Sequence, residues 1–498
     1  MAWMDLISVW FLFALTLAFL WERCNFWKSS SRKLPPGPRP LPLIGNLHLL
    51  DLKRPYRTML KFSKQYGPVF SIQLGFQKMV VLAGYKTVKE ALVNQADAFA
   101  DRPMVPIFED FEHGHGVILS NGETWKVMRR FTISTLRDYG MGKKTIEDRI
   151  VEECRFLIQK FESFEGKPFE TTTIMNAAVA NIIVTILLGK RFDEYEDPTF
   201  LRLLNMVNEN TQLFGSPSVM LYNMFPALGF LSGGRKTVLK NRDELFAFIQ
   251  ATFVEHLKEL DVNDQRSFID AFLTQQQEEK NKNQSNEFFH NENLKAVVEN
   301  LFGAGMETTS TTLRWGLLLM MKYPEIQKKV QEEIAKVIGS AQPRIEHRAK
   351  LPYTDAVIHE VQRFGNILPS GVPRATTTDV TLGDYFIPKG TQIIPLLYSV
   401  LYDESEWEKP SKFYPEHFLD SKGKFAKRDA FLPFSAGRRV CAGETLAKME
   451  LFLFFVSLMQ RFTFQPAPGT SKEDLDLTPA VGFTAPSMPF RICALPHS

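Results

Sequence analysis

Residues 434–443, Phe-Ser-Ala-Gly-Arg-Arg-Val-Cys-Ala-Gly, constrain this chain more than any other stretch, because one cysteine stands between two glycines. An apolar run at residues 446–459 follows and predicts a helix, so Cys441 lies near a helix N-terminus. The helix dipole and the two arginines before the cysteine favour a thiolate, which is a nucleophile or a metal ligand. Gly437 and Gly443 let the backbone turn tightly and approach a flat object closely. A buried structural cysteine is the alternative, because most lone cysteines are structural.

The composition excludes some classes of protein. With 59 Lys plus Arg against 56 Asp plus Glu, the net charge of +3 does not indicate nucleic-acid binding. Four scattered cysteines do not form a disulfide framework, which favours a reducing compartment. The 498 residues are enough for a large core. The 42 phenylalanines would serve either such a core or an apolar ligand cavity.

Residues 6–21 form an almost wholly apolar segment that is just long enough to span a bilayer. It begins at Asp5 and ends in bulky residues, unlike a cleaved signal peptide. Basic residues follow it, so the positive-inside rule puts the rest of the chain in the cytoplasm. Residues 35–40, Pro-Pro-Gly-Pro-Arg-Pro, are stiff and cannot join a helix. We therefore expect a membrane anchor at residues 1–22, a basic and proline-rich hinge at 23–40 and one catalytic domain at 41–498; a buried core helix at 6–21 is the weaker alternative.

Hydrophobic periodicity predicts a mainly helical body with small β-sheets and no internal repeat. The predicted helices cover residues 85–94, 123–137, 143–164, 174–188, 235–260, 294–321, 354–364 and 446–459. The predicted strands cover residues 69–74, 79–82, 379–382 and 392–394, with loops at 97–121, 278–293 and 407–428. Residues 214–230 are apolar but broken by prolines and a glycine, so dipping into lipid and ordinary packing are equally expected.

The cysteine stretch resembles the haem-binding loop of cytochromes P-450, Phe-x-x-Gly-x-Arg-x-Cys-x-Gly. The matching residues are Phe434, Gly437, Arg439, Cys441 and Gly443. The resemblance implies haem b as cofactor, with Cys441 as its thiolate ligand. It also implies the cytochrome P-450 fold, preceded by an N-terminal transmembrane anchor helix. The chain as a whole looks like a microsomal member of the vertebrate family 2 type.

A second motif lies in the middle of the long helix predicted over residues 294–321. Gly305 lowers helix propensity there, and a threonine hydroxyl can bend a helix by bonding back to a carbonyl. Alone, this stretch would be interpreted as a helix with a polar seam. It resembles the family's oxygen-activation motif, small-Gly-x-acid-Thr. The resemblance places Ala304 against the haem, assigns Thr308 to hydrogen-bonding dioxygen and assigns Glu307 to relaying protons.

Further residues match positions that bind the haem propionates in the family. Trp125 and Arg129 are spaced i, i+4 and fit Trp-x-x-x-Arg. Arg439 matches another propionate ligand, and Arg374 stands where related members have a histidine. A guanidinium suits this task because it grips a carboxylate bidentately. The alternative for Arg374 is a solvated arginine on a strand.

Glu360 and Arg363 share a helix face and match the family's buried Glu-x-x-Arg pair, which fixes the polar stretch before the cysteine loop. A third partner usually comes from a Pro-Glu-Arg-Phe-like motif. Here that motif reads Pro-Glu-His-Phe at residues 415–418, with His417 in place of the arginine. The sequence therefore leaves the three-way charge network open.

No Gly-x-Gly-x-x-Gly turn after a strand is present, so the sequence offers no site for a nicotinamide or flavin. Electrons must come from a partner, which the resemblance identifies as NADPH–cytochrome P-450 reductase, with cytochrome b5 as a second donor. A basic set on or near the predicted helix at 123–137 would dock that acidic partner; a solvated basic face is the alternative. The set comprises Lys126, Arg130, Arg137 and Lys143.

The resemblance implies mono-oxygenation: one oxygen atom of O2 enters a lipophilic substrate, in an enzyme held on the endoplasmic reticulum membrane with its catalytic domain in the cytoplasm. A haem-thiolate isomerase or dehydratase that acts on peroxides without a reductase is the first alternative, and a membrane-anchored haem carrier or sensor is the second. Fatty acid, steroid and xenobiotic substrates all stay open. By resemblance, the pocket is lined by Phe108, Val117, Ile118, Phe302, Ala304, Ile367, Leu368, Val372 and Phe483.

Overall fold

The computed structural model describes residues 10, 13, 16, 33–261, 264–282 and 287–497. Apart from three positions, the predicted anchor lies outside these residues. Among the helices of the described part, none is long and apolar enough to cross a membrane. Residues 33–40, the described part of the predicted hinge, lie against the body: the Ser71 N–H donates to the Pro36 carbonyl at 2.7 Å, and Asn46 Nδ2 donates to the Pro38 carbonyl at 3.2 Å.

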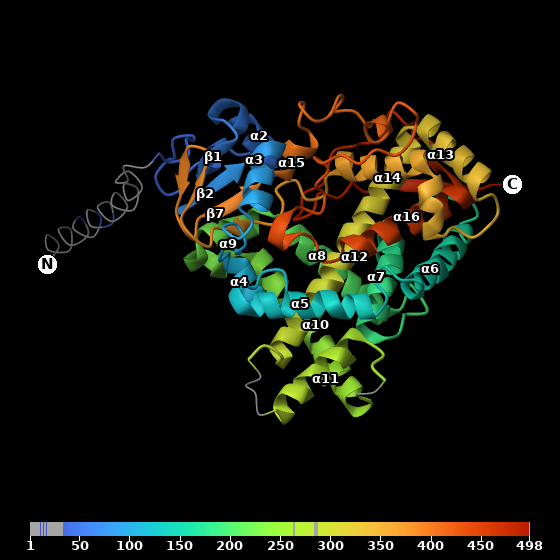
Figure 1. The fold of residues 1–498 in the computed structure, drawn as a ribbon, viewed down its shortest axis with the longest axis horizontal. Helices are drawn as coiled ribbons and strands as arrows, with labels where there is room; N and C mark the ends of the chain where they lie inside the picture. Colours follow the sequence, from blue (N-terminus) through green and yellow to red (C-terminus); the bar gives the residue numbers. More distant parts are fainter. Residues whose placement is uncertain are drawn as a thin grey trace.

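A four-stranded sheet lies close to residue 33, with helices filling the rest of the molecule (Figure 1). Its order is β1 (Val69–Leu74), β2 (Gln77–Leu82), β7 (Gln392–Pro395) and β4 (Arg374–Ala375). β1 and β2 are antiparallel neighbours in sequence, whereas β7 joins β2 in parallel from more than half the chain away. In a second sheet, β9 (Arg491–Pro496) lies between β3 (Phe169–Glu170) and β8 (Phe462–Pro466), and in a third, β5 (Val380–Leu382) pairs with β6 (Tyr385–Ile387).

The structure confirms the predicted mainly helical class. Its described helices are α2 (Pro55–Tyr66), α3 (Tyr85–Lys89), α4 (Pro106–Glu112), α5 (Gly122–Asp138), α6 (Lys144–Glu162), α7 (Thr172–Leu188), α8 (Pro198–Phe214), α9 (Pro217–Met224), α10 (Gly233–Lys258), α11 (Phe268–Asn281), α12 (Asn291–Lys322), α13 (Pro324–Val337), α14 (Pro352–Gly365), α15 (Leu397–Leu401) and α16 (Glu444–Arg461).

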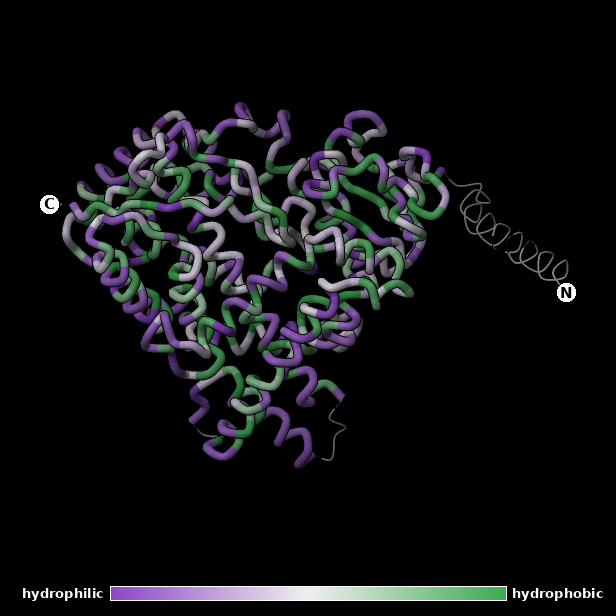
Figure 2. The backbone as a smooth tube through the Cα atoms, turned by 180° about the vertical axis from the view of Figure 1, so that it is seen from behind, coloured by the Kyte–Doolittle hydropathy of each residue, from purple (hydrophilic) through white to green (hydrophobic). Residues whose placement is uncertain are grey.

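Helix α12 runs through the middle of the body and packs against α7, α14 and α16 (Figure 1). α7 is buried on nearly all sides, as expected of a helix that is apolar all round. The C-terminal half of α12 is also buried on nearly all sides, although residues 307–314 of it are mostly polar. Figure 2 shows the hydrophobic stretches concentrated in the interior and the hydrophilic ones around the periphery. Helix α16 leads from the cysteine loop directly into this core.

Two predicted loops were wrong in part, whereas the predicted end of the long helix at residues 294–321 was confirmed to within one residue. The loop expected over residues 97–121 contains α4, which begins at Pro106, and the loop expected over 278–293 loses its ends to α11 and α12. Pro324 ends α12 as expected but also opens α13. Proline has no N–H to satisfy at the first helical position, so it starts a helix as readily as it stops one.

Residues 214–230 form the end of α8, all of α9 and most of a 3-10 turn at Pro226–Leu231. Val219 and Tyr222 pack inward, while the side chains of Leu221, Phe230 and Leu231 are 49%, 67% and 71% exposed. One face of this segment therefore packs onto the body, and the other face is apolar and exposed.

Candidate active site

The cysteine loop is a short 3-10 turn, Gly437–Arg439, followed by Cys441 and then by α16. The Cys441 N–H donates to the Phe434 carbonyl at 3.1 Å and closes the loop. Gly437 has φ +72°, and a Cβ there would lie 1.6 Å from the Leu92 carbonyl oxygen, so only glycine fits. Gly443 has an ordinary φ of −92°, and a Cβ on it would meet no other protein atom within 4 Å.

The Cys441 side chain is accessible to solvent although it lies within the body of the protein. Burial raises the pKa of its thiol, while the Gly443 and Glu444 N–H groups and Arg129 oppose that rise. The helix N-terminus and Arg129 therefore lower the pKa of the Cys441 thiol, as predicted, but in the protein alone the increase caused by burial is larger. A cation bound to the sulfur would reverse this balance, since a coordinated thiol is deprotonated.

The middle of α12 presents small and polar groups. Ala304 is exposed although its helix crosses the core, and the Thr308 hydroxyl donates to the Ala304 carbonyl at 2.7 Å. α12 nevertheless continues as an α-helix through this point. Gly305 serves packing, because a Cβ there would lie 2.7 Å from Ile183 Cδ1 on α7.

The Glu307 carboxyl forms its hydrogen bonds with residues other than its neighbour Thr308. Its Oε1 accepts hydrogen bonds from Thr311 Oγ1 at 3.0 Å and from Thr484 Oγ1 at 2.9 Å, and Oε2 has no partner. Burial raises the pKa of Glu307, while Arg314 and the two threonine hydroxyls oppose that rise. The acid and the alcohol predicted as a pair are adjacent in sequence without contacting each other.

Arginine side chains converge beside the cysteine loop from three parts of the chain. Arg129 of α5 donates to the Val440 carbonyl at 2.6 Å, and Arg374 of β4 donates to the Ala436 carbonyl at 2.8 Å. Arg439 donates to the Ala100 and Ser120 carbonyls at 2.7 and 2.8 Å, and its guanidinium lies 3.8 Å from the centre of the Trp125 indole. The structure thus brings together the four residues predicted to bind propionates.

The guanidiniums of Arg374 and Arg439 are buried and that of Arg129 is half-buried, and in the described protein no anion compensates them. Across the described ranges none of them forms an ion pair, although Asp101 lies near Arg439. Arg374 Nε and Nη1 and Trp125 Nε1 are buried donors with no hydrogen-bond partner. Burial, reinforced by the neighbouring arginines, lowers the pKa of Arg374 to about 10 and that of Arg439 to about 9, so both are charged at neutral pH. The donor set fits a bound group with carboxylates.

Arg102 is a fourth member of this cluster and was missed from the sequence. Its Nε donates to the Ile118 carbonyl at 2.9 Å, and its Nη1 donates to the Val372 and Pro373 carbonyls at 3.0 and 2.7 Å. Burial lowers the pKa of Arg102 well below its ordinary value, and Arg374, Arg439 and Arg129 add to that shift. No sequence motif includes Arg102. Its position next to Asp101, in a loop rich in buried residues, is the one signal that could have identified it.

Several residues of the predicted pocket meet around aromatic rings. The rings of Phe108 and Phe483 are 6.0 Å apart, and both lie near Phe214, at 5.3 and 6.5 Å. Phe214 was not predicted here, because only folding places the end of α8 against α4. Arg102 ties Ile118 to Val372, and the Ala485 N–H donates to the Ile367 carbonyl at 2.8 Å. Val117 and Phe302 are buried, while Leu368 is half-buried.

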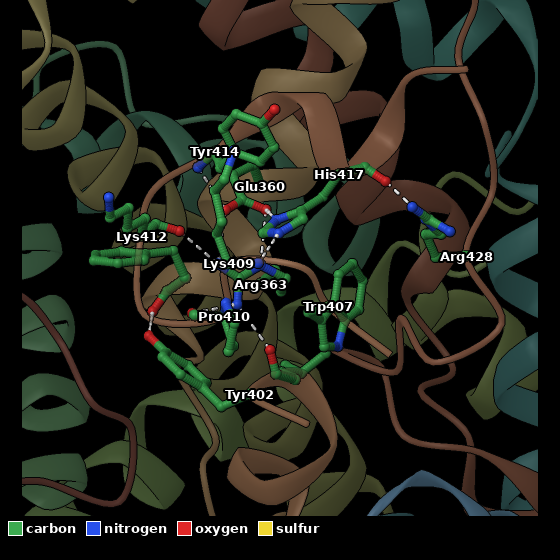
Figure 3. A network of polar contacts seen from close by, with 12 residues as sticks. Glu360, Arg363, Tyr402, Trp407, Lys409, Pro410, Lys412, Tyr414, His417 and Arg428 are labelled. Carbon is green, nitrogen blue, oxygen red and sulfur yellow. Dashed lines mark hydrogen bonds and ion pairs between the residues drawn. The ribbon is translucent and has the colours of Figure 1, made fainter. Parts of the chain in front are cut away.

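Glu360 and Arg363 form a bidentate ion pair in α14, with N···O distances of 2.7 and 2.8 Å and no exposed side-chain surface (Figure 3). The remaining Arg363 donors reach the carbonyls of Leu401, Pro410 and Lys412 at 2.8–2.9 Å. Every guanidinium donor therefore has an acceptor, and the pair holds the chain before the cysteine loop, as the resemblance implies.

His417 completes this network without a third charge (Figure 3). Its Nδ1 lies 3.1 Å from Glu360 Oε2, and its Nε2 accepts the Lys409 N–H at 3.2 Å. Because a backbone N–H can only donate, Nε2 is unprotonated and the ring proton is on Nδ1. A neutral histidine thus stands where the family has a charged arginine.

The predicted basic set lies on the exposed face of α5 and at the N-cap of α6. Arg130, Arg137 and Lys143 are exposed, and Lys126 pairs with Glu123 at 2.6 Å. Next to the cysteine loop is a hollow of about 450 Å³. Its lining includes Arg348, Lys427, Arg428, Phe434 and Lys448.

Comparison with known proteins gives consistent matches over the whole body. The cytochrome P450 family model matches residues 35–494. Cytochrome P450 2K4 of Oncorhynchus mykiss is 55% identical over 93% of this chain and 92% of its own. Cytochrome P450 2K6 of Danio rerio is 53% identical over 92% and 90%, and cytochrome P450 2C5 of Oryctolagus cuniculus is 48% identical over 95% and 96%.

Proposed function

The chain belongs to the cytochrome P450 family and is therefore a haem b mono-oxygenase; from that premise we propose that it oxidises lipophilic substrates at the endoplasmic reticulum membrane, with electrons from NADPH–cytochrome P-450 reductase. Haem b, when bound, supplies the electron-transfer and oxygen chemistry. The observation that carries the proposal is the set of buried guanidiniums beside one cysteine loop, with donors that no group of the described protein satisfies.

In this proposal the arginines hold the cofactor and Cys441 is its thiolate ligand. Arg129, Arg374 and Arg439 bind the propionates, and Trp125 Nε1 and the free nitrogens of Arg374 are the donors that await them. Arg102, with no acceptor but backbone carbonyls, adds positive charge at the same place. Gly443 has no side chain and Ala304 has only a methyl group, so both leave room for the cofactor.

Thr308 and Glu307 are proposed to hold and move protons. The Thr308 hydroxyl donates to the Ala304 carbonyl, and its lone pairs stay available to accept a hydrogen bond. The unpartnered Oε2 of Glu307 gives a second station, and its raised pKa brings proton exchange closer to neutral pH. Because the two side chains do not touch, transfer between them requires water or rotation of Glu307.

The substrate is proposed to be lipophilic because the expected pocket is apolar on several sides. Phe108, Phe214 and Phe483 form an aromatic cluster, and Val117 and Phe302 are apolar and buried. Such walls favour apolar ligands by burial of nonpolar surface. They do not distinguish a fatty acid from a steroid or a xenobiotic.

The exposed basic residues of α5 and the hollow beside the cysteine loop are the proposed docking area for the reductase and cytochrome b5. Attraction between a basic face and an acidic partner speeds encounter and weakens with salt. The membrane is proposed to contact the exposed apolar residues of the α9 region, next to the 48% exposed Phe76 of the β1–β2 turn. Phe76 lies 6.1 Å from Phe225, so these two segments share one surface.

Reconstitution with reductase and NADPH tests the function, using a panel of a fatty acid, a steroid and an aromatic xenobiotic. We expect NADPH-dependent product and a red-shifted Soret band for the reduced protein with carbon monoxide. Cys441→Ser should abolish both, while Cys493→Ser, at a buried strand cysteine, should retain both. A wild-type spectrum like that of a histidine-ligated globin would refute the thiolate. Peroxide rearrangement without NADPH would point to the isomerase instead.

A further inference from the structure

The segment between α4 and α5 is held onto α12 by two asparagine side chains. Asn293 Oδ1 accepts the Gly116 N–H at 3.1 Å, and Asn300 Oδ1 accepts the Val117 and Ile118 N–H groups at 2.9 and 3.1 Å. Gly116 has φ +80°, and a Cβ on it would lie 2.5 Å from Asn300 Oδ1. The approach is therefore too close for any residue except glycine.

The other end of the Asn300 amide is bound by two carboxyl groups. Asn300 Nδ2 donates to Glu112 Oε1 of α4 at 2.7 Å and to Glu299 Oε2 at 3.0 Å. The amide then has all four of its hydrogen bonds, and the two backbone N–H groups fix which end is oxygen. Asn300 and Glu112 are buried and Glu299 is half-buried. Glu112 Oε2 is left without a partner.

Two carboxylates on one amide NH2 group repel each other when both are ionised. Burial and the neighbouring Glu299 raise the pKa of Glu112 well above its ordinary value, and burial raises the pKa of Glu299 to about 7. A cation nearby is Arg102, which lowers the pKa of Glu112 only in part.

The other titratable groups near the clamp are three histidines and three carboxylates. His113 is exposed, and His115 and His290 lie edge to face with ring centres 5.0 Å apart, where burial lowers the pKa of both below the ordinary histidine value. Asp110 is bound by Tyr222 and Arg235, and Glu292 by Lys295. Glu109 is exposed on the outer face of α4.

We propose that Glu112, Asn300 and Glu299 form a proton-dependent clamp that positions residues 113–118 over the substrate pocket. When one carboxyl is protonated, a single charge is shared on the amide and the segment stays closed. When both are ionised, repulsion in a desolvated place favours an open segment in which water solvates them. The three are positioning residues, and the inference rests on the proposed function only because Val117 and Ile118 belong to the proposed pocket.

The direction of the pH effect follows from the raised pKa. In the open segment each carboxyl titrates near its ordinary value of about 4.5. Opening therefore releases protons as the pH rises from that value through the raised pKa values of the closed clamp, about 7 for Glu299 and well above the ordinary value for Glu112. The contribution to closure is fully present at the acidic end and is lost as the pH rises through those raised values.

Hydrogen exchange on the haem-loaded enzyme without substrate tests the clamp. After correction for the intrinsic pH dependence of exchange, protection of the Gly116, Val117 and Ile118 amides should fall by up to about tenfold per pH unit between about pH 5.5 and about pH 7. Glu112→Gln and Glu299→Gln each remove one titrating carboxyl and the repulsion between the two, so in both variants this dependence should be weaker than in wild type. Glu109→Gln, on the same helix, should behave like wild type.

A second variant covers the case in which an amide substitution disturbs the fold. Asn300→Asp keeps the acceptor for the two N–H groups but adds a third carboxylate, so protection should be lower at every pH and the substrate KM should rise more than kcat changes. The proposal is overturned if amide protection in the wild type does not depend on pH, or if both Gln variants keep the full wild-type pH dependence of protection. Absence of turnover with normal exchange would instead refute the proposed function and leave the clamp intact.

Discussion

Two sets of buried arginines in this protein differ in how their charge is compensated. Arg363 has a carboxylate and three carbonyls for its five N–H donors, whereas Arg374 reaches one hydroxyl and one carbonyl and leaves two nitrogens unpaired. Both side chains have almost no exposed surface. Burial alone therefore does not identify a binding site. Unsatisfied donors do identify one, because the protein itself supplies every hydrogen-bond acceptor of a structural arginine, whereas the donors of a binding arginine are satisfied only by its ligand.

The largest expected effect comes from breaking the completed set. Glu360→Gln should destabilise the protein by about 3–5 kcal/mol, because it leaves the Arg363 charge buried and unpaired. Unfolding in guanidinium chloride, followed by tryptophan fluorescence, measures the loss. The matched control is Glu244→Gln, which breaks a bidentate pair with Arg202 whose side chains are 42–43% exposed and should cost less than about 1 kcal/mol. Equal effects at both positions would erase the distinction.

His417 offers a sharper test of the completed set. His417→Ala should cost about 2–4 kcal/mol, because Glu360 and the Lys409 N–H lose a partner and the packing with Trp407 is lost. His417→Arg brings back the family's third charge but removes the acceptor for Lys409. If the ring acts as a neutral donor and acceptor, arginine should not exceed wild-type stability in the same unfolding experiment. A more stable arginine variant would show that charge is what the position needs.

The incomplete set should respond differently. Arg374→Met should leave the unfolding midpoint of the haem-free protein unchanged or higher, because a poorly compensated buried charge is removed. Loss of haem to an excess of acceptor protein should be about 10- to 100-fold faster, as hydrogen bonds to charged groups contribute about 1.5–3 kcal/mol. Arg438→Met, at an exposed residue paired with Asp97, is the control and should retain haem like wild type. Unchanged haem loss in Arg374→Met would exclude it as a propionate ligand.

Glu450 gives the smallest effect and extends the comparison to a buried acid. On α16 it accepts one hydrogen bond, from Thr309 of α12 at 3.2 Å, and its other oxygen is unpaired. Burial raises its pKa to about 8. Its contribution to stability is therefore fully present below about pH 4.5 and is lost as the pH rises through the folded value.

Between pH 6 and 8 the free energy of unfolding of the wild type should fall by about 1–2 kcal/mol more than that of Glu450→Gln, which does not titrate. Thermal unfolding across this range measures the difference. Parallel pH profiles would mean that Glu450 is ionised in the folded protein at neutral pH.

What the sequence could predict depended on how local the determinants are. Cys441 and its glycines, Glu360 with Arg363, and the spacing of Trp125 and Arg129 lie within one loop or one helix, so a motif describes them completely. Arg102, Phe214 and the Glu112–Asn300 contact depend on segments up to 271 residues apart, which no local pattern encodes. His417 lies between these cases: its position was predicted, but its protonation follows from the Lys409 N–H, which only the fold brings to it.

The way residues 116–118 are held bears on how this enzyme could change its substrates over evolutionary time. Asn293 and Asn300 bind backbone N–H groups, which every residue except proline carries. Mutations at Val117 and Ile118 can therefore alter the surface of the proposed pocket without loosening the attachment. Gly116 has no such freedom. A lineage that kept one glycine and two asparagines could diversify the neighbouring side chains while inheriting the same loop.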